Sequence, residues 1–445
     1  MRDLAKVVTI ATKNKMFEKD KICVVTFKEL GYEAIVPVSC NVGDKMVFIQ
    51  EGSILPEIGK WEFLRKRCYV STLKGFLIRP MVMGAKDDNG QKGDKVKSWG
   101  LCVTLAEAGL EENLKAGADV TEDLKIRKYE PVEDASPTSE KRPKWVKFCM
   151  RHKLLCWIGK IWLHKKQRKR NENFPTDVIQ KSDETSIQNC PAVIREFLGK
   201  KAYVTVKIEG QSATMSLDPK KRYSFYVCSR NNRFDSTTDS TSKNFFHTAE
   251  VYAIEKKLRA YLKKTGVVLM LQGEQCGPGI QGNIYDFDDN KLFIYRMKGL
   301  ENGKWIEYPY PKMKAIADEL GLDCVPLLEV VDDMGAKLNV IRTSVKDENG
   351  NEIDAYNTAE VIDSLVKYAE GIFWRPTKDG IDYHYQPKAS EKLWRDYLQA
   401  EGIVIKSEDY NKEENRPFSF KVKNCAYAEH LYTEMHEIAR KLGEN

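Results

Sequence analysis

The segment with the clearest chemical potential in this 445-residue chain is Tyr203–Met215, which reads YVTVKIEGQSATM. Its alternation places the valines and Ile208 on one face of a predicted strand and Thr205, Lys207 and Glu209 on the other, more open face, before a break at Gly210. A lysine amine is a nucleophile only when neutral, and at its ordinary pKa of about 10.4 it is almost wholly protonated. A lysine on the exposed face of a strand is common, so this segment alone does not define a site.

Other segments support a chemical role for this one. Tyr203–Met215 resembles motif I (K-x-[DE]-G) of the covalent nucleotidyltransferases, with Glu209 where aspartate is usual. Leu269–Asn283 (LMLQGEQCGPGIQGN) contains Glu274 and resembles motif III of RNA ligases. Its glycines also match G-x-G-x-x-G, but residues 283–290 lead into another predicted strand and not into a helix. We therefore reject a dinucleotide-binding loop.

Two further segments resemble motifs of the same superfamily. LFIYRMK at Leu292–Lys298 puts Phe293 and Tyr295 on one strand face, as motif IIIa places an aromatic ring against adenine. Core packing is the alternative explanation for either ring. The segment CSRN at residues 228–231 resembles motif Ia and contains Arg230.

The C-terminal part supplies the last two motifs. PFSFKVKN places Lys421 and Lys423 on one strand face and resembles motif V (K-x-K). EGIVIK, which begins at Glu401, resembles motif IV. A second candidate is Glu370 in AEGIFWRP, which lies further from Lys421. We prefer Glu401 because motifs IV and V are normally near neighbours and EGIVIK is the closer match.

Together, in this order, the motifs resemble those of ATP-dependent RNA ligases in the branch with an N-terminal OB-fold domain. Glu62–Tyr69 and Gly75–Ala85 are similar to that barrel, and Gln180–Asn189 to the stretch upstream of the nucleophile. Closely spaced short strands over the first ~110 residues also favour a barrel. We expect an α+β fold: an OB-like barrel at 1–112, a linker with a basic aromatic segment at 113–172, and a nucleotidyltransferase domain at 173–445. Helices expected in the last domain include Ala249–Lys264 and the terminal Tyr427–Leu442.

The resemblance implies a three-step reaction. Lys207 would attack ATP and carry AMP, AMP would pass to a 5′-phosphate end of RNA, and a 3′-OH would displace it. Mg²⁺ or Mn²⁺ would be held by Glu401 directly or through water, and Lys421 and Lys423 would meet the triphosphate. The nucleotide pocket would also contain Glu209, Arg230, Glu274, Tyr295 and Phe293. Burial and the nearby cations are expected to lower the pKa of Lys207.

Composition adds limits. The net charge of +7 is local, because residues 141–170 hold twelve Lys and Arg and no Asp or Glu. This segment also carries three tryptophans. It is either a packed helical linker or a surface for RNA or an anionic membrane. The sequence contains no run of 18 apolar residues, so no segment is predicted to span a membrane. The eleven cysteines without a C-x-x-C pair indicate an intracellular, cytoplasmic protein, or a nuclear one if the run Lys165–Arg170 is a targeting signal.

Three other functions use similar motifs. A capping guanylyltransferase or a common DNA ligase would carry an OB domain after motif V, where only about 20 residues remain here. A catalytically inactive RNA-binding module on the same fold is the alternative from another class. Such a module would not need the intact lysines and glutamates.

Overall fold

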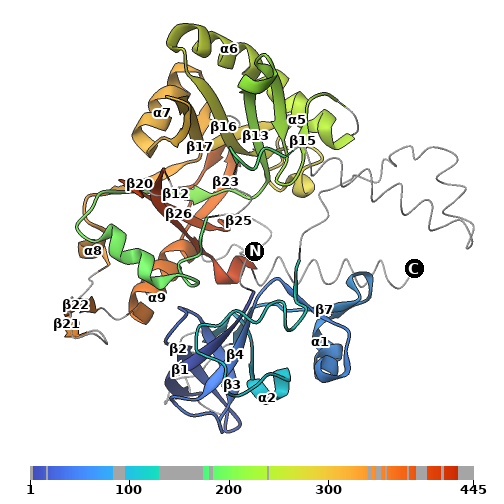
Figure 1. Ribbon diagram of the computed structural model, residues 1–445, viewed down its shortest axis with the longest axis vertical. Coiled ribbons are helices and arrows are strands. Elements are labelled where there is room, and N and C mark those ends of the chain that lie inside the picture. Colours follow the sequence, from blue (N-terminus) through green and yellow to red (C-terminus); the bar gives the residue numbers. More distant parts are fainter. Residues whose placement is uncertain are drawn as a thin grey trace, which may run out of the picture.

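The structure is a computed structural model that describes residues 4–16, 19–83, 96–129, 174–179, 184–237, 240–338, 343–346, 352–355, 358–377, 380–386, 398–411 and 415–428. Predictions for residues 144–170 lie outside the described residues, as does the helix expected at Tyr427–Leu442 beyond residue 428. Figure 1 shows a barrel formed by the start of the chain, in blue, and a larger sheet-rich part, in green to red.

The N-terminal part is an antiparallel sheet that curls into a nearly closed barrel. Its strands are, in sheet order, β10 (Gly100–Thr104), β4 (Lys45–Gln50), β1 (Ala5–Lys15), β2 (Ile22–Phe27) and β3 (Glu33–Pro37). The sheet curls until its ends meet: Trp99 N–H donates to the Glu33 carbonyl at 3.1 Å, and Ile35 N–H to Ser98 Oγ at 3.3 Å. The predicted barrel followed by a mixed α/β part is confirmed.

A smaller sheet flanks the barrel. Its strands are β11 (Arg127–Lys128), β5 (Ser53–Pro56), β7 (Gly75–Leu77) and β6 (Tyr69–Val70). The short helices near it are η1 (Gly59–Leu64), α1 (Arg65–Cys68), η2 (Ser71–Leu73) and α2 (Leu105–Ala108), and β8 (Met81–Met83) pairs with β9 (Val96–Ser98). Val120, Leu124 and Ile126 are buried in the core between the barrel strands and this smaller sheet. Packing against the barrel thus continues past the predicted boundary at residue 112.

Among the described residues, two large sheets dominate the second part, and the larger of them has seven strands. They are β15 (Arg233–Phe234), β14 (Ser224–Cys228), β13 (Gln211–Asp218), β16 (Val268–Cys276), β17 (Lys291–Glu301) and β18 (Lys304–Glu307), with β19 (Asp323–Cys324) beside β17. Apolar residues of α5 (Ser240–Val251), α6 (Ile254–Thr265) and α7 (Tyr310–Glu319) share one core with this sheet. We predicted a single helix at Ala249–Lys264. The chain instead breaks at Ala253, whose φ of 49° is left-handed.

The smaller sheet has the order β20-β12-β26-β27. Its strands are β20 (Leu327–Val331), β12 (Ala202–Lys207), β26 (Gly402–Asn411) and β27 (Arg416–Lys423). Around it lie η3 (Pro191–Phe197), α8 (Met334–Lys337), α9 (Thr358–Glu370), the pair β21 (Thr343–Lys346) and β22 (Glu352–Ala355), and the sheet β24 (Gly380–Asp382), β23 (Phe373–Thr377) and β25 (Leu398–Gln399). Two short helices connect strands of the larger sheet: η4 (Pro219–Lys221) lies between β13 and β14, and η5 (Gln281–Asn283) between β16 and β17. Thr205 was expected on the open face of its strand but is buried. The reason is that β12 lies between two partner strands and both its faces are covered.

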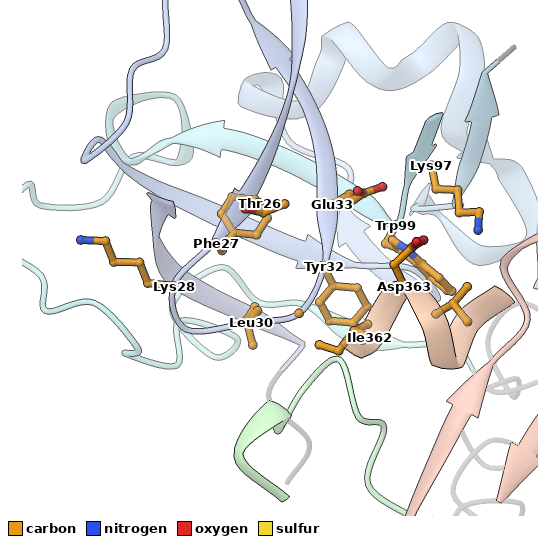
Figure 2. A pocket seen from close by; sticks show the side chains of 12 residues that line it. Thr26, Phe27, Lys28, Leu30, Tyr32, Glu33, Lys97, Trp99, Ile362 and Asp363 are labelled. Carbon is orange, nitrogen blue, oxygen red and sulfur yellow. The ribbon is translucent and has the colours of Figure 1, made fainter. Parts of the chain in front are cut away.

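The two parts share one apolar core. It joins barrel residues such as Tyr32 and Phe48 to Ile362 and Leu365 of α9 and to Ile403 of β26. A backbone hydrogen bond of 2.8 Å from Gly31 N–H to the Gln188 carbonyl also crosses this boundary. Figure 2 shows a small pocket of about 70 Å³ at the same boundary, between the barrel and α9.

Candidate active site

Strand register places two candidate residues, Lys207 and Lys423, in one row and a third beside it. Lys207, at the end of β12, pairs with Gly402 of β26, and Gly402 pairs with Lys423 of β27. Glu401 immediately precedes this row. The row needs glycine at position 402, because a Cβ there would lie 2.1 Å from the Val422 carbonyl oxygen. The close approach explains why motif IV is an E-G pair in this chain.

Lys207 forms an ion pair with Glu401. The Lys207 ammonium donates to Glu401 Oε2, and the two side chains are 26% and 27% exposed. Burial acts to lower the pKa of Lys207, but Glu401, Glu209 and Glu274 outweigh it and raise the pKa above the ordinary value. The protein's own groups therefore do not produce the expected lowering of the Lys207 pKa. Carboxylates dominate the surroundings of this lysine.

Glu209 is held by two tyrosines from distant segments. Tyr427 donates its hydroxyl hydrogen to Glu209 Oε2 at 2.8 Å, and the Glu209 N–H donates to the Tyr285 hydroxyl oxygen at 2.8 Å. Burial and the neighbouring Glu401 carboxylate raise the pKa of Glu209 to about 8. Our sequence reasoning missed both tyrosines. Neither stands in a repeating pattern, and their contacts span 76 and 218 residues of chain.

The seven-stranded sheet brings Glu274 to the same place. A Cβ at Gly210 would lie 2.6 Å from the Gln275 carbonyl oxygen and 3.0 Å from Glu274 Cγ, so the chain after Glu209 runs closely along β16. Glu274 pairs with Ser212 of β13 on one side and with Phe293 of β17 on the other. The two sheets therefore meet where motifs I and III meet.

The two predicted adenine-stacking rings belong to one apolar cluster with Val206 and Ile208. Phe293 is buried in this cluster, and Tyr295 is half-buried at its edge. The Tyr295 hydroxyl is 2.7 Å from Ser212 Oγ. Tyr295 is thus the more accessible ring, and Phe293 is a core residue.

The motif V lysines lie in different environments. Lys421 is buried, and its backbone is bonded to the stretch upstream of motif I. Its N–H donates to the Thr185 carbonyl at 2.8 Å, and its carbonyl accepts from Ile187 N–H at 2.9 Å. Lys423 is partly exposed, and its ammonium donates to Glu51 of the barrel. The barrel therefore contributes a carboxylate beside the predicted triphosphate site, which sequence reasoning missed.

The stretch upstream of motif I also locks the two sheets together. Glu184 accepts a hydrogen bond from Arg296 of β17 at 2.5 Å and another from Ser419 of β27 at 2.5 Å. Arg296 and Lys406 further pair with Glu307 at 3.1 and 3.7 Å. Two buried cations thus balance two buried carboxylates, and Arg296 and Lys406 take no part in the Lys207 cluster.

Two other candidates have different surroundings. Arg230 sits in the turn between β14 and β15, where Ser229 Oγ accepts from the Asn232 N–H at 3.1 Å. Glu370, the alternative motif IV residue, pairs with Lys97 of the barrel at 2.9 Å. The structure thus brings Lys207, Glu209, Glu274 and Glu401 together, with Lys421 and Lys423 on the neighbouring strand.

The carboxylates fit a divalent cation that is shared with a substrate. Among the described residues no group of three His, Cys, Asp or Glu side chains is arranged to hold a metal by itself. Mg²⁺ is commonly held by one or two carboxylates together with substrate phosphates and water. Glu401, Glu209 and Glu274 all act on the single ammonium of Lys207, and a divalent cation would offset this excess of carboxylates.

Comparison with known proteins agrees with this architecture. The chain is similar to the solved structure of Naegleria gruberi RNA ligase with pyrophosphate, at 20% identity and a TM-score of 0.65, covering 97% of this chain and 99% of that one. It is equally similar to two variants of that ligase. One was solved with ATP and Mn (20% identity, TM-score 0.64, 98% of each chain), and the other with AMP and Mn (20%, 0.65, 96% and 99%). These likenesses establish the fold.

The family follows from the sequence match. The model of the RNA ligase family matches residues 200–423, just over half of the chain, and this span contains every motif described above. The chain belongs to the RNA ligase family and is an enzyme that joins RNA. No curated protein matches it in sequence. Within the described part of the chain, no helix has the length and apolar character needed to cross a bilayer.

Proposed function

We propose that this protein is an ATP-dependent RNA ligase that joins 3′-OH and 5′-phosphate ends through a lysyl-AMP intermediate. The observation that carries the proposal is the contact between Lys207 and Glu401, at the point where both sheets and motifs I, III, IV and V converge. The N. gruberi ligase variants solved with ATP and Mn, and with AMP and Mn, support the choice of nucleotide and of a divalent metal.

In the first step the neutral Lys207 amine attacks the α-phosphorus of ATP. A nitrogen–phosphorus bond forms, the bond to the bridging oxygen breaks, and pyrophosphate leaves with that electron pair. Lys207 must lose its proton first, and Glu401 is the hydrogen-bonded carboxylate that can accept it. Lys421 and Lys423 stabilise the charge on the phosphates. A divalent cation held by Glu401 would supply further positive charge there.

Two later steps complete the join. A 5′-phosphate oxygen attacks the phosphorus of lysyl-AMP, so AMP passes to the RNA end and the Lys207 amine is released. A 3′-OH then attacks the activated 5′-phosphate, and AMP leaves. Glu274 would hold the ribose, and Tyr295 would stack on adenine. Arg230 would bind the sugar or a phosphate.

We also propose that the barrel binds the RNA. OB-like barrels hold nucleic acid strands through a basic surface with exposed aromatic rings. Catalysis would then depend on residues after 173, with the barrel placing the RNA ends beside them.

The test of lysyl-AMP formation uses α-labelled ATP and denaturing electrophoresis. The Lys207→Ala variant should show no label transfer, because the covalent bond needs the amine. It should still seal a nick that already carries AMP at its 5′ end. Label on this variant equal to that on the parent protein would refute the role of Lys207. Matched RNA and DNA nicks measured in parallel should show a preference for RNA, and a stronger reaction on DNA would count against the RNA assignment.

A further inference from the structure

The barrel reaches the proposed catalytic site through the turn between β4 and β5. Glu51 lies in this turn, and its Oε1 accepts a hydrogen bond from the Lys423 ammonium. The neighbouring Gln50 accepts from Asn189 Nδ2 at 3.3 Å, so the turn also contacts the stretch upstream of motif I. The partners Glu51 and Lys423 are 372 residues apart in the chain.

The two side chains of this ion pair differ in exposure. The Glu51 side chain is 1% exposed, whereas that of Lys423 is 25% exposed. A buried carboxylate is costly unless it is fully hydrogen-bonded, yet Glu51 Oε2 has no hydrogen-bond partner among the residues the structure describes. A lysine ammonium has three donor hydrogens, so Lys423 retains donors on its open side while one is taken by Glu51. The pair therefore holds the ammonium in place and leaves one side of it available.

The Lys423 ammonium is held near Lys207. Lys207, Gly402 and Lys423 occupy one row across three adjacent strands. Two strand spacings separate the backbones of the two lysines by roughly 10 Å. A free lysine side chain on a strand end would sample many rotamers, whereas one fixed by a buried partner presents its charge at a single position.

We propose that Glu51 is a positioning residue: it fixes the Lys423 ammonium where the β- and γ-phosphates of ATP bind, and so makes formation of lysyl-AMP depend on the docked barrel. The proposal rests on the proposed function, because it takes Lys423 as a phosphate ligand. It differs from simple domain docking, in which the ion pair would only join the two parts. It also differs from sequestration, in which Glu51 would compete with the phosphates.

A nucleotide-binding comparison in the Lys207→Ala background separates these cases. This background cannot form the covalent bond, so calorimetry with Mg²⁺ measures binding of ATP and AMP without turnover. Glu51→Gln should weaken ATP binding about tenfold, as expected for a displaced charge-assisted contact. It should leave AMP binding within about twofold, because AMP lacks the β- and γ-phosphates. A domain-docking residue would change both affinities or neither, and a sequestering residue would give tighter ATP binding when replaced; each of these results would overturn the proposal.

Three further measurements complete the test. Glu370→Gln breaks a second ion pair between the parts, Lys97 to Glu370 at 2.9 Å, and should change neither affinity. In a Lys423→Ala background, Glu51→Gln should have no further effect on ATP binding, because Glu51 acts through Lys423. Glu51→Asp keeps the negative charge and should bind ATP more tightly than Glu51→Gln does. If Glu51→Gln does not fold, Glu51→Asp is measured in its place. If the Lys207→Ala parent itself bound neither nucleotide, the proposed function would fail before Glu51 is tested.

Discussion

Glu401 and Glu370 each precede a glycine, but their surroundings give them different roles. Glu401 contacts Lys207, and the positive charges of Lys207 and Lys421 keep its pKa below the ordinary value although burial acts to raise it. Glu370 contacts Lys97 at the edge of the barrel. A residue that assists the reacting amine must lie within hydrogen-bonding distance of it. Glu401 meets this condition.

The first prediction concerns these two residues. Glu401→Ala should lower the rate of lysyl-AMP formation by about 100-fold or more, because it removes the carboxylate that faces the lysine and would hold the metal. Glu370→Ala should stay within about threefold of the parent, since it removes a partly exposed ion pair. Label transfer at saturating ATP measures both. Full activity of the Glu401 variant together with an inactive, folded Glu370 variant would reverse the assignment.

At the scale of elements, the two sheets are joined by the buried network of Glu184, Arg296, Glu307 and Lys406. Burial acts to raise the pKa of Glu184, but Arg296, Lys406 and the Ser419 hydroxyl outweigh it and lower the pKa to about 2. A carboxyl group whose pKa is lower in the folded protein stabilises it at a pH above the unfolded pKa. That stabilisation is lost as the pH falls from about 4.5 toward 2.

The second prediction follows from the lowered pKa of Glu184. Glu184→Gln should lower the free energy of unfolding at pH 7 by about 3 kcal/mol, because it leaves Arg296 as a buried cation with one partner fewer. The difference from the parent should shrink as the pH falls below about 4.5, where the unfolded chain protonates this group. Denaturant unfolding of both proteins at several pH values measures it. A difference that is constant with pH would show that the charge of Glu184 is not the cause.

The site could be predicted from sequence where its residues lie on strands of regular pattern. Lys207, Glu274 and Lys421 stand on strands whose alternation and motif order are local properties of the chain. Glu51 and Tyr427 could not be found in this way, because their contacts depend on how distant segments are folded together. The same limit applied to Thr205. Alternation predicts the face of a residue but not whether another layer covers that face.

The break between α5 and α6 shows a second limit. Helical periodicity continues through residues 249–264, so a single helix was the simplest prediction. The structure ends α5 at Val251 because the chain turns at Ala253 to pack both helices on the same sheet. Packing against a sheet outweighs helix propensity, which is worth only tenths of a kcal/mol per residue. Tertiary contacts therefore decided this boundary.

At the scale of the whole molecule, the barrel is not an independent attachment. Its core is continuous with α9 and β26, and Figure 2 shows Tyr32 and Trp99 of the barrel beside Ile362 and Asp363 of α9. Removing the barrel would expose this shared apolar core and would release Lys423 from Glu51. The function of the barrel in RNA binding is therefore better tested by surface substitutions in the intact chain.

A surface around α1 offers such positions. Phe63, at the end of η1, is 62% exposed, and Lys66 and Arg67 beside it are also exposed. Arg79 donates to the Arg67 carbonyl at 2.7 Å, which brings a further cation to α1. Arg65, in contrast, is paired with Glu57 at 2.8 Å and with Glu62, so its charge is already balanced within the barrel.

The last prediction is that this surface contacts the phosphates and bases of nicked duplex RNA. Lys66→Ala and Arg67→Ala should each weaken RNA binding and reduce the slope of log affinity against log salt by about one, because each removes one phosphate contact. Phe63→Ala should cost about 1–3 kcal/mol if the ring stacks on a base. Arg65→Ala is the matched control, since the two neighbouring glutamates leave it little net charge to offer. Binding measured by fluorescence anisotropy between 0.05 and 0.2 M salt distinguishes these outcomes. Label transfer from ATP should be unchanged in all four variants, because α1 lies on the barrel, well apart from the strand β12 that carries Lys207 (Figure 1). Equal salt slopes for the Lys66, Arg67 and Arg65 variants would place the RNA on another face of the molecule.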